Sequence, residues 1–314
     1  MTDKRKRILI TGASGFLAAH SAALFRREGW EVAALDLREP QGLYRQILPP
    51  DVPLFLGDIM DASRLDEVLA AFHPSGIIHA AAIVGPVPAR GHPSNATRVN
   101  VLGTLNVLEA ARAHELRVTY LSTATLYGTR PDGRPLCEDE CPNPVGIYDA
   151  TKLMGETLAI AYFRTYGVDV ACVRPSFVYG PGAASGEYLL PRAVRGESFD
   201  IPYGRDHPLD LTYVDDLVRG LYLAHTVRPI EHRVFNVSSG LLRTFGDLAD
   251  EVRKAVPSAA ISLGPGIHPD RHLRGPCDIT RARVELGFEP RFDLRRGVAA
   301  WLDWLSSHGK EGKD

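Results

Sequence analysis

The chain has 314 residues, of which 45% are hydrophobic and 24% are charged, and its formal net charge is −2. These values are typical of a soluble globular protein with one large or two modest domains. They argue against a nucleic-acid partner, which would favour a strongly basic surface. The one basic run, residues 4–7, immediately precedes a predicted strand and is interpreted as its solvated entrance.

Neither a membrane segment nor a metal site is expected. No apolar stretch approaches 18 residues and the N-terminus does not resemble a signal peptide, so we expect a cytoplasmic protein without a membrane partner. The four cysteines, at positions 137, 141, 172 and 277, are too few and too scattered for a disulfide framework. Cys137 and Cys141 flank acidic residues, but no second Cys or His pair stands at ligand spacing, so we expect no metal.

The chain begins with a predicted strand, a glycine-rich turn and a helix. The apolar run 7–11 leads into this turn, and a helical pattern follows as far as Glu28. Gly12 permits a tight turn, Gly15 lets a pyrophosphate approach the backbone, and the small Ala18 allows the helix to pack on the strand. Phosphates would then lie at the helix N-terminus, where free N–H groups favour negative charge. The predicted cofactor-binding residues here are Gly12, Ser14, Gly15, Phe16 and Leu17.

Asp36 is expected to select the dinucleotide. It closes the second predicted strand, residues 31–37. A carboxylate at this position can accept both ribose hydroxyls of NAD and would repel the 2′-phosphate of NADP. Arg38, two residues later, could instead attract that phosphate. We interpret Arg38 as a solvated loop residue and therefore predict NAD as the cofactor.

Strands and helices continue to alternate as far as residue 174. The remaining strands are expected at residues 52–56, 76–82, 118–121 and 169–174, and the helices at residues 62–72, 94–114 and 147–166. This alternation predicts an α/β fold with a doubly wound parallel sheet. Residues 83–93 are expected to form a loop. The fourth strand ends in small residues, including Ala80 and Ala81, which a cofactor backbone could pass. Asn100 lies inside the predicted helix 94–114 and needs hydrogen-bond partners if it is buried.

Tyr148 and Lys152 are the candidate catalytic pair. Residues four apart lie on the same face of a helix, so the ammonium group of Lys152 can approach the phenol of Tyr148. A nearby positive charge favours the phenolate, so a buried Lys152 together with a cationic cofactor ring could lower the pKa of Tyr148 from its usual value near 10. The same spacing also arises by chance on solvated helices. Whether it is catalytic depends on the other motifs in the chain.

A hydroxyl-rich stretch, residues 122–125, follows the fifth predicted strand. The carboxyl ends of parallel strands face the ligand crevice, so these hydroxyls could meet a substrate. Ser122 and Thr125 could equally stabilise a turn.

The regular alternation breaks after the sixth strand. Proline and glycine residues in the stretch 175–182 predict a loop. The later elements indicate a smaller C-terminal α/β domain that binds substrate. Thr244 with Asp247 forms a capping-box pattern for one of its helices. We assign residues 1–175 and about 210–240 to the dinucleotide-binding domain. Residues of about 176–209 and 241–314 form the predicted substrate domain.

These motifs together resemble the extended short-chain dehydrogenase/reductase family, the NAD-dependent epimerase/dehydratase group. The motifs that carry the resemblance are residues 11–18, Asp36, Thr123, Tyr148 with Lys152, residues 174–182 and residues 213–216. Ala18 replaces the third glycine of the family pattern. The resemblance covers nearly the whole chain and implies the Rossmann fold, the cofactor NAD, a small-molecule substrate and a homodimer.

The resemblance also implies residue roles. Tyr148 would exchange a proton with the substrate hydroxyl, and Lys152 would lower the tyrosine pKa and bind the nicotinamide ribose. Thr123 would be the third catalytic residue and would hold the substrate oxygen. Asp58, with Ile59, would contact the adenine.

Two positions depart from the family's nucleotide-sugar epimerases. Those enzymes carry an asparagine and an arginine that hold the substrate diphosphate, and here Phe177 and Leu209 stand in their places. Neither side chain can donate a hydrogen bond or carry charge, so a diphosphate would lose partners. Replacement cations could come from loops, and the candidates are Arg90, Arg192, Arg205, Arg271 and Arg274. Phe177, Arg90 and Arg192, with Thr123, are the predicted substrate residues.

Three functions are compatible with these motifs. A dehydrogenase would release NADH and an oxidised sugar-like or hydroxy-acid product. A nucleotide-sugar epimerase or dehydratase would reduce and reoxidise NAD within one turnover. A non-catalytic NAD-binding sensor would not need the three catalytic residues. The departures at Phe177 and Leu209 favour the dehydrogenase.

Overall fold

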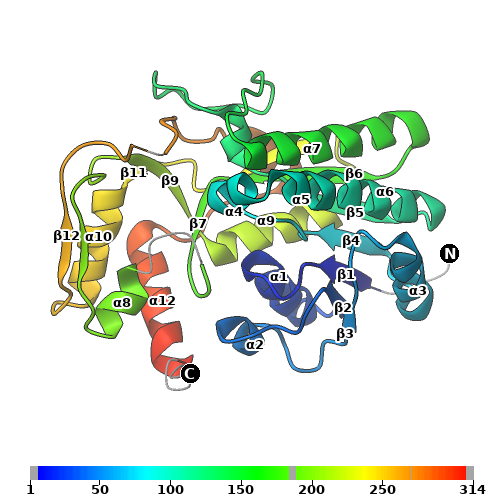
Figure 1. Cartoon of the computed structure of the whole chain (residues 1–314), viewed down its shortest axis with the longest axis horizontal. Coiled ribbons are helices and arrows are strands. Elements are labelled where there is room, and N and C mark those ends of the chain that lie inside the picture. Colours follow the sequence, from blue (N-terminus) through cyan, green and yellow to red (C-terminus); the bar gives the residue numbers. More distant parts are fainter. Residues whose placement is uncertain (1–5, 184–188, 270, 309–314) are drawn as a thin grey trace.

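The computed structural model describes residues 6–183, 189–269 and 271–308. A large parallel sheet with its helices forms one part of the molecule, and a group of smaller sheets and helices lies beside it (Figure 1). No helix among the described residues is both long and apolar enough to cross a membrane.

The large sheet has seven parallel strands in the order β10-β6-β5-β4-β1-β2-β3. The strands are β1 (Arg7–Thr11), β2 (Glu31–Asp36), β3 (Leu54–Leu56), β4 (Gly76–His79), β5 (Arg117–Leu121), β6 (Val170–Pro175) and β10 (Val234–Val237). All residues of β4, β5 and β6 are buried, as expected where helices cover both faces. The predicted α/β fold with a doubly wound sheet is confirmed, although β4 ends at His79, before the alanines placed in it from the sequence.

Helices cover both faces of this sheet (Figure 1). One face carries α3 (Ala62–Phe72), α6 (Thr104–Ala113) and α7 (Ile147–Tyr166), and the other carries α1 (Phe16–Arg27) and α9 (Val214–Thr226). Shorter helices flank these: α2 (Leu43–Ile47), which the sequence did not predict, and α11 (Thr280–Leu286). Buried apolar side chains fill both interfaces and hold the strand ends in fixed positions.

The segment between β4 and β5 differs from the prediction. Residues 83–93 were expected to form a loop, but α4 (Pro86–Gly91) lies within them. The long helix then begins as α5 (Pro93–Thr97), passes through a π-helical stretch, η1 (Arg98–Gly103), and continues as α6. Such π-helical turns are rare and often lie at functional sites.

The smaller part of the molecule contains two sheets. One has the strand order β11-β9-β7, from β7 (Phe177–Tyr179), β9 (Pro208–Tyr213) and β11 (Leu242–Thr244), and the other pairs β8 (Phe199–Ile201) with β12 (Ile261–Leu263). The helices α8 (Leu189–Val194), α10 (Phe245–Ala255) and α12 (Leu294–His308) pack on them. Thr244 and Asp247 form the capping box predicted for α10.

Residues 175–182, expected as a loop, contain β7, because Phe177–Tyr179 pairs in parallel with β9. The sequence could not reveal a partner that lies more than 30 residues downstream. The division into a dinucleotide-binding and a substrate-binding domain stays a prediction.

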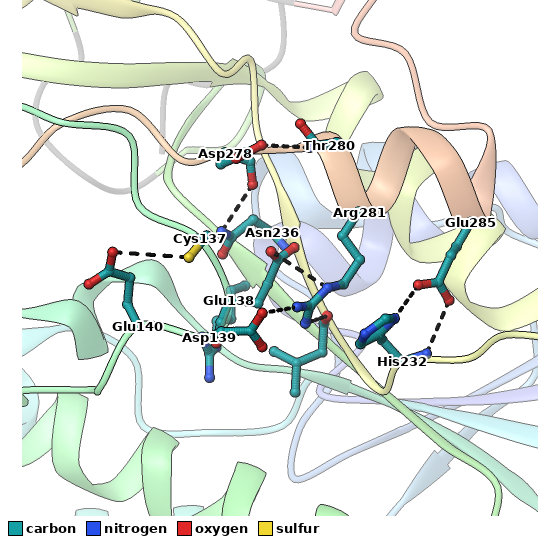
Figure 2. Close-up of polar contacts among 12 residues, drawn as sticks. Cys137, Glu138, Asp139, Glu140, His232, Asn236, Asp278, Thr280, Arg281 and Glu285 are labelled. Carbon is teal, nitrogen blue, oxygen red and sulfur yellow. Dashed lines mark hydrogen bonds and ion pairs between the residues drawn. The ribbon is translucent and has the colours of Figure 1, made fainter.

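The loop 128–146 is fixed against the edge of the large sheet. The carboxylate of Glu138 accepts the backbone N–H of Asn236 on β10 at 2.8 Å. Arg281 on α11 lies between Glu138 and Asp139 and donates to Asp139 at 2.7 Å (Figure 2). Leu136 and Cys277 form an isolated parallel bridge. The short η2 (Ala124–Tyr127) precedes this loop.

Candidate active site

The glycine-rich turn lies at the carboxyl end of β1. Gly12 has a φ of +74°, and a Cβ at this position would lie 2.7 Å from backbone atoms of Ala81, so a larger residue cannot be accommodated. Gly15 is the N-cap of α1 and offers no side-chain acceptor to the N–H groups of the first turn. Phe16 and Leu17 begin the helix and are half-buried. These free donors and the helix dipole suit an anion such as a pyrophosphate.

Asp36 lies next to this turn. Its carboxylate accepts the backbone N–H of Ser14 at 2.9 Å and that of Arg38 at 3.4 Å. The Ser14 hydroxyl in turn donates to the carbonyl of Arg38 at 2.6 Å. Asp36 is only partly buried, whereas Arg38 is exposed, so the carboxylate rather than the guanidinium is held in place beside the turn.

The other predicted cofactor residues surround the same edge of the sheet. Ala80 and Ala81 follow β4 and are partly buried, and the N–H of Ala81 donates to the Thr11 hydroxyl at 3.3 Å. Asp58 and Ile59 follow β3, where the Asp58 carboxylate accepts the N–H of Met60 at 2.9 Å. These donors, small residues and carboxylates fit a dinucleotide that lies across the carboxyl ends of the strands.

The three predicted catalytic residues meet at the ends of β5 and α7. Thr123 is the N-cap of η2, immediately after β5, and Tyr148 is the second residue of α7. The Thr123 side chain lies close enough to the phenol of Tyr148 to influence its pKa. Lys152 lies one helical turn further along α7. Their catalytic roles stay predictions.

Burial dominates the electrostatics of Tyr148 in the protein without cofactor. Burial is the largest effect on its phenol, and the charge of Asp149 adds to it, so the pKa of Tyr148 is raised above its usual value. The nearby Thr123 side chain only partly opposes this shift in pKa. The protein's own groups therefore favour the neutral phenol, and the expectation that Lys152 and a cationic cofactor ring together lower this pKa stays a prediction.

The burial of Lys152 explains why it does little to favour the phenolate of Tyr148. Its side chain is 3% exposed, and its Nζ lies 4.2 Å from the centre of the Tyr120 ring. Burial lowers the pKa of Lys152 to about 7, although nearby Cys172 and Glu156 oppose the shift. At neutral pH this lysine is therefore charged only part of the time, so it favours the phenolate less than a permanent cation would.

Asn100 has the hydrogen-bond partners expected of a buried amide. Its Oδ1 accepts the N–H of Ile83 at 2.7 Å, and its Nδ2 donates to the carbonyl of Ile83 at 3.1 Å. The same Nδ2 donates to the Thr151 hydroxyl at 3.0 Å, which links the π-helical turn to α7 next to Lys152. His79 is also a buried packing residue, since its ring bonds to the hydroxyls of Thr11 and Thr104.

The predicted substrate residues are not gathered in one place. Phe177 lies on β7 with the guanidinium of Arg271 5.1 Å from its ring centre. Arg90 is exposed on α4. Arg192 on α8 is held by Glu197, by the carbonyl of Ser198 and by the ring of Phe199. Arg205, a further candidate, pairs with Asp250 at 2.8 Å.

Sequence reasoning missed a contact beside Tyr148. Asp149 is buried and accepts the N–H of Gly146, and its carboxylate lies 3.5 Å from Nε2 of His272. Burial raises the pKa of Asp149, but the nearby His272 and the N–H of Gly146 help to lower it below its usual value. The only sequence signal was an acid inside the Tyr-x-x-x-Lys motif. Its partner, more than 100 residues away, gave no signal.

The chain is similar to known proteins over most of its length. The profile of the NAD dependent epimerase/dehydratase family matches residues 8–238. A dTDP-glucose 4,6-dehydratase of Streptomyces antibioticus is 31% identical over 313 residues, which cover 95% of this chain and 91% of that protein. A UDP-glucose 4-epimerase of Mycolicibacterium smegmatis is 30% identical, with 95% and 98% covered.

A solved structure is similar over nearly the whole chain. The crystal structure of UDP-glucose 4-epimerase from Thermus thermophilus in complex with NAD superposes with a TM-score of 0.85 at 26% identity. The match covers 98% of this chain and 100% of that one.

We predict that NAD binds at least about tenfold more tightly than NADP, because repulsion between Asp36 and a 2′-phosphate exceeds roughly 1.4 kcal/mol in a partly dry site. Asp36→Ala should shrink this preference. Asp36→Asn should do the same while retaining an acceptor for Ser14. Calorimetric titration of both cofactors measures the effect, with the exposed Asp66→Ala as control. Equal affinities in the wild type would assign the selectivity to Arg38.

We also predict that Lys152→Met raises the free energy of unfolding by more than about 1 kcal/mol at pH 6.5, because a buried ammonium group is costly. The folded-state pKa of about 7 lies below the unfolded value of 10.5, so the cost is full below pH 7 and fades as the pH rises toward 10.5. Urea unfolding at pH 6.5 and 9.5 measures this. A difference between variant and wild type that stays constant over that range would contradict the prediction.

Proposed function

Because this chain belongs to the NAD-dependent epimerase/dehydratase family, and is therefore an enzyme that uses NAD, we propose that it is a dehydrogenase of a small, non-nucleotide hydroxyl compound. The substrate would be a sugar-like alcohol or a hydroxy acid. The observation that carries this proposal is the apolar character of Phe177 and Leu209. Leu209 is buried on β9, and Phe177 lies on β7, the neighbouring strand of the same sheet.

The reaction would oxidise a secondary alcohol. The carbinol carbon loses a hydride and its hydroxyl loses a proton, which gives a carbonyl product, NADH and one proton released to solvent. NAD, when bound, accepts the hydride and brings a cationic ring that favours a phenolate nearby. Tyr148 would take the hydroxyl proton, and Thr123 would hold the substrate oxygen. Lys152 would provide further positive charge at the same place.

The raised pKa of Tyr148 affects which direction of the reaction, oxidation or reduction, the protein favours. A neutral phenol is already the proton donor that carbonyl reduction needs, whereas alcohol oxidation needs the phenolate. The cationic cofactor ring and a protonated Lys152 must therefore offset the burial of Tyr148 during oxidation.

A nucleotide-sugar epimerase or dehydratase is the second candidate. The relatives named dTDP-glucose 4,6-dehydratase and UDP-glucose 4-epimerase, at 30 to 31% identity, favour it. Arg271 could supply charge that Phe177 cannot. Two missing contacts of about 1.5 to 3 kcal/mol each would nevertheless weaken a nucleotide sugar by roughly two to four orders of magnitude.

We further propose a homodimer and a cytoplasmic location. Leu102 on η1 and Met154 on α7 are 45% and 50% exposed, and these two helices pack side by side. Apolar side chains on neighbouring exposed helices suit a partner surface. The location stays a prediction, which cell fractionation would test.

Tyr148→Phe should fold and bind NAD but lose turnover by about 100-fold or more, the scale of a lost general acid–base group. NADH formation from free sugars, alditols and hydroxy acids, compared with UDP-glucose, measures the effect and identifies the reaction. Tyr166→Phe at the exposed end of α7 is the control. Undiminished turnover in Tyr148→Phe would refute the proposed role. Conversion of UDP-glucose without net NADH would favour the second candidate.

In solution the protein should have about twice its chain mass of 34.3 kDa. Met154→Asp and Leu102→Asp should each shift it toward the monomer, because a charge in an apolar interface loses its hydration. Val284→Asp, at a position that is 78% exposed on α11, should have no effect. Sedimentation equilibrium decides the matter, and a monomeric wild type would exclude the dimer at the concentrations used.

A further inference from the structure

The 271–278 segment is held firmly beside the candidate active site. The carbonyl of Leu273 accepts the N–H of Arg130 at 2.6 Å, and that of Pro276 accepts the N–H of Leu136 at 2.9 Å. The N–H of Cys277 donates to the buried carboxylate of Asp210 at 2.9 Å. These bonds at both ends fix the path of the backbone between them.

Gly275 shows how closely this segment approaches the loop 128–146. A Cβ at this position would lie 2.1 Å from the carbonyl oxygen of Arg134 and would clash with the backbone there. The preceding residues also touch the catalytic helix, because His272 lies 3.5 Å from the carboxylate of Asp149, which directly follows Tyr148. The ring of His272 is oriented further by the Thr129 hydroxyl at 3.2 Å. The segment is therefore anchored on two sides.

Arg274 projects from the middle of this anchored segment. Its guanidinium donates to the carbonyl of Ala124 at 3.3 Å, and Ala124 directly follows Thr123. Among the described residues, no carboxylate lies within ion-pair distance of Arg274. Burial lowers the pKa of Arg274, and the more distant charges of Asp149 and Asp210 only partly oppose this. A half-buried guanidinium with one long hydrogen bond and no counter-ion can still bind an anion.

We infer that Arg274 binds the carboxylate of the substrate, which makes the substrate a small polyhydroxy acid. This inference rests on the proposed dehydrogenase function and names its substrate class. The planar guanidinium suits a carboxylate because it can donate two parallel hydrogen bonds. Since Arg274 contacts the residue next to Thr123, the carboxylate lies near the carbon whose hydroxyl Thr123 and Tyr148 hold.

The other arginines proposed from the sequence do not offer the same site. Arg192 and Arg205 already pair with Glu197 and Asp250, and Arg90 is exposed on α4. Arg271 lies over the ring of Phe177 on β7. Arg274 thus combines burial, an anchored backbone and closeness to Thr123.

The test compares matched acids and neutral polyols with the intact protein and NAD. The probes are threonate, gluconate and galactonate, the alditols threitol, glucitol and galactitol, and UDP-glucose. The variants are Arg274→Gln, Arg274→Lys and, as control, Arg283→Gln, whose arginine pairs with Glu289 on the surface. Steady-state NADH formation gives kcat and KM, calorimetry gives NAD affinity, and thermal unfolding reports on folding.

We expect the wild type to oxidise at least one acid and to discriminate against its alditol. Arg274→Gln should raise KM for that acid by about 10- to 100-fold, the range for losing a charged hydrogen-bond partner. Arg274→Lys should recover part of the loss. NAD affinity should not change, and Tm should not fall, because no ion pair is broken. Arg283→Gln should behave as the wild type.

Several results would overturn the inference. Failure of the wild type to form NADH from any of the acids would overturn the acid as substrate class. An Arg274→Gln variant that lowers Tm and kcat without raising KM would show that Arg274 has a structural role. Oxidation of the alditols as efficient as that of the acids would overturn the assignment while the dehydrogenase function stands. Conversion of UDP-glucose without net NADH would overturn both.

Discussion

The buried ion pair between Glu156 on α7 and Arg174 on β6 is the interaction on which the site most depends. Both side chains are about 95% buried, and Nε of Arg174 donates to Glu156 at 3.0 Å. Glu156 also accepts the Ser122 hydroxyl at 2.7 Å, which ties the end of β5 to α7. Removing one partner would leave an uncompensated charge, typically at a cost of about 3 to 5 kcal/mol. The pair therefore fixes Tyr148 and Lys152 relative to Thr123.

The same network extends to the segment that carries Arg274. Arg174 donates to the Tyr127 hydroxyl at 2.7 Å, and Tyr127 donates to Asn236 at 2.9 Å. Asn236 then donates to the carbonyls of Leu136 and Asp278, at the loop and at the end of the 271–278 segment (Figure 2). A continuous set of buried polar contacts thus joins the catalytic helix, the sheet edge and the proposed carboxylate site. Satisfied networks of this kind make a site rigid.

Burial has opposite effects on the pKa values of Tyr148 and Lys152, the candidate catalytic pair. It raises the pKa of Tyr148 and lowers that of Lys152 to about 7, so the protein alone favours the neutral form of both. Their spacing in the sequence showed that they could meet but not how much solvent would surround them. The degree of burial depends on Tyr120, Cys172 and Glu156, which come from different elements.

The sequence by itself determined the parallel sheet, the glycine turn, Asp36 and the positions of Tyr148 and Lys152, because hydrophobic period, turn chemistry and motif spacing are local properties. It did not reveal β7, α4 or the π-helical turn, since pairing and packing decide these. Only the tertiary structure brought Arg274 beside Ala124 and His272 beside Asp149. Contacts between residues more than 100 positions apart depend on how the whole chain packs, and no local pattern encodes them.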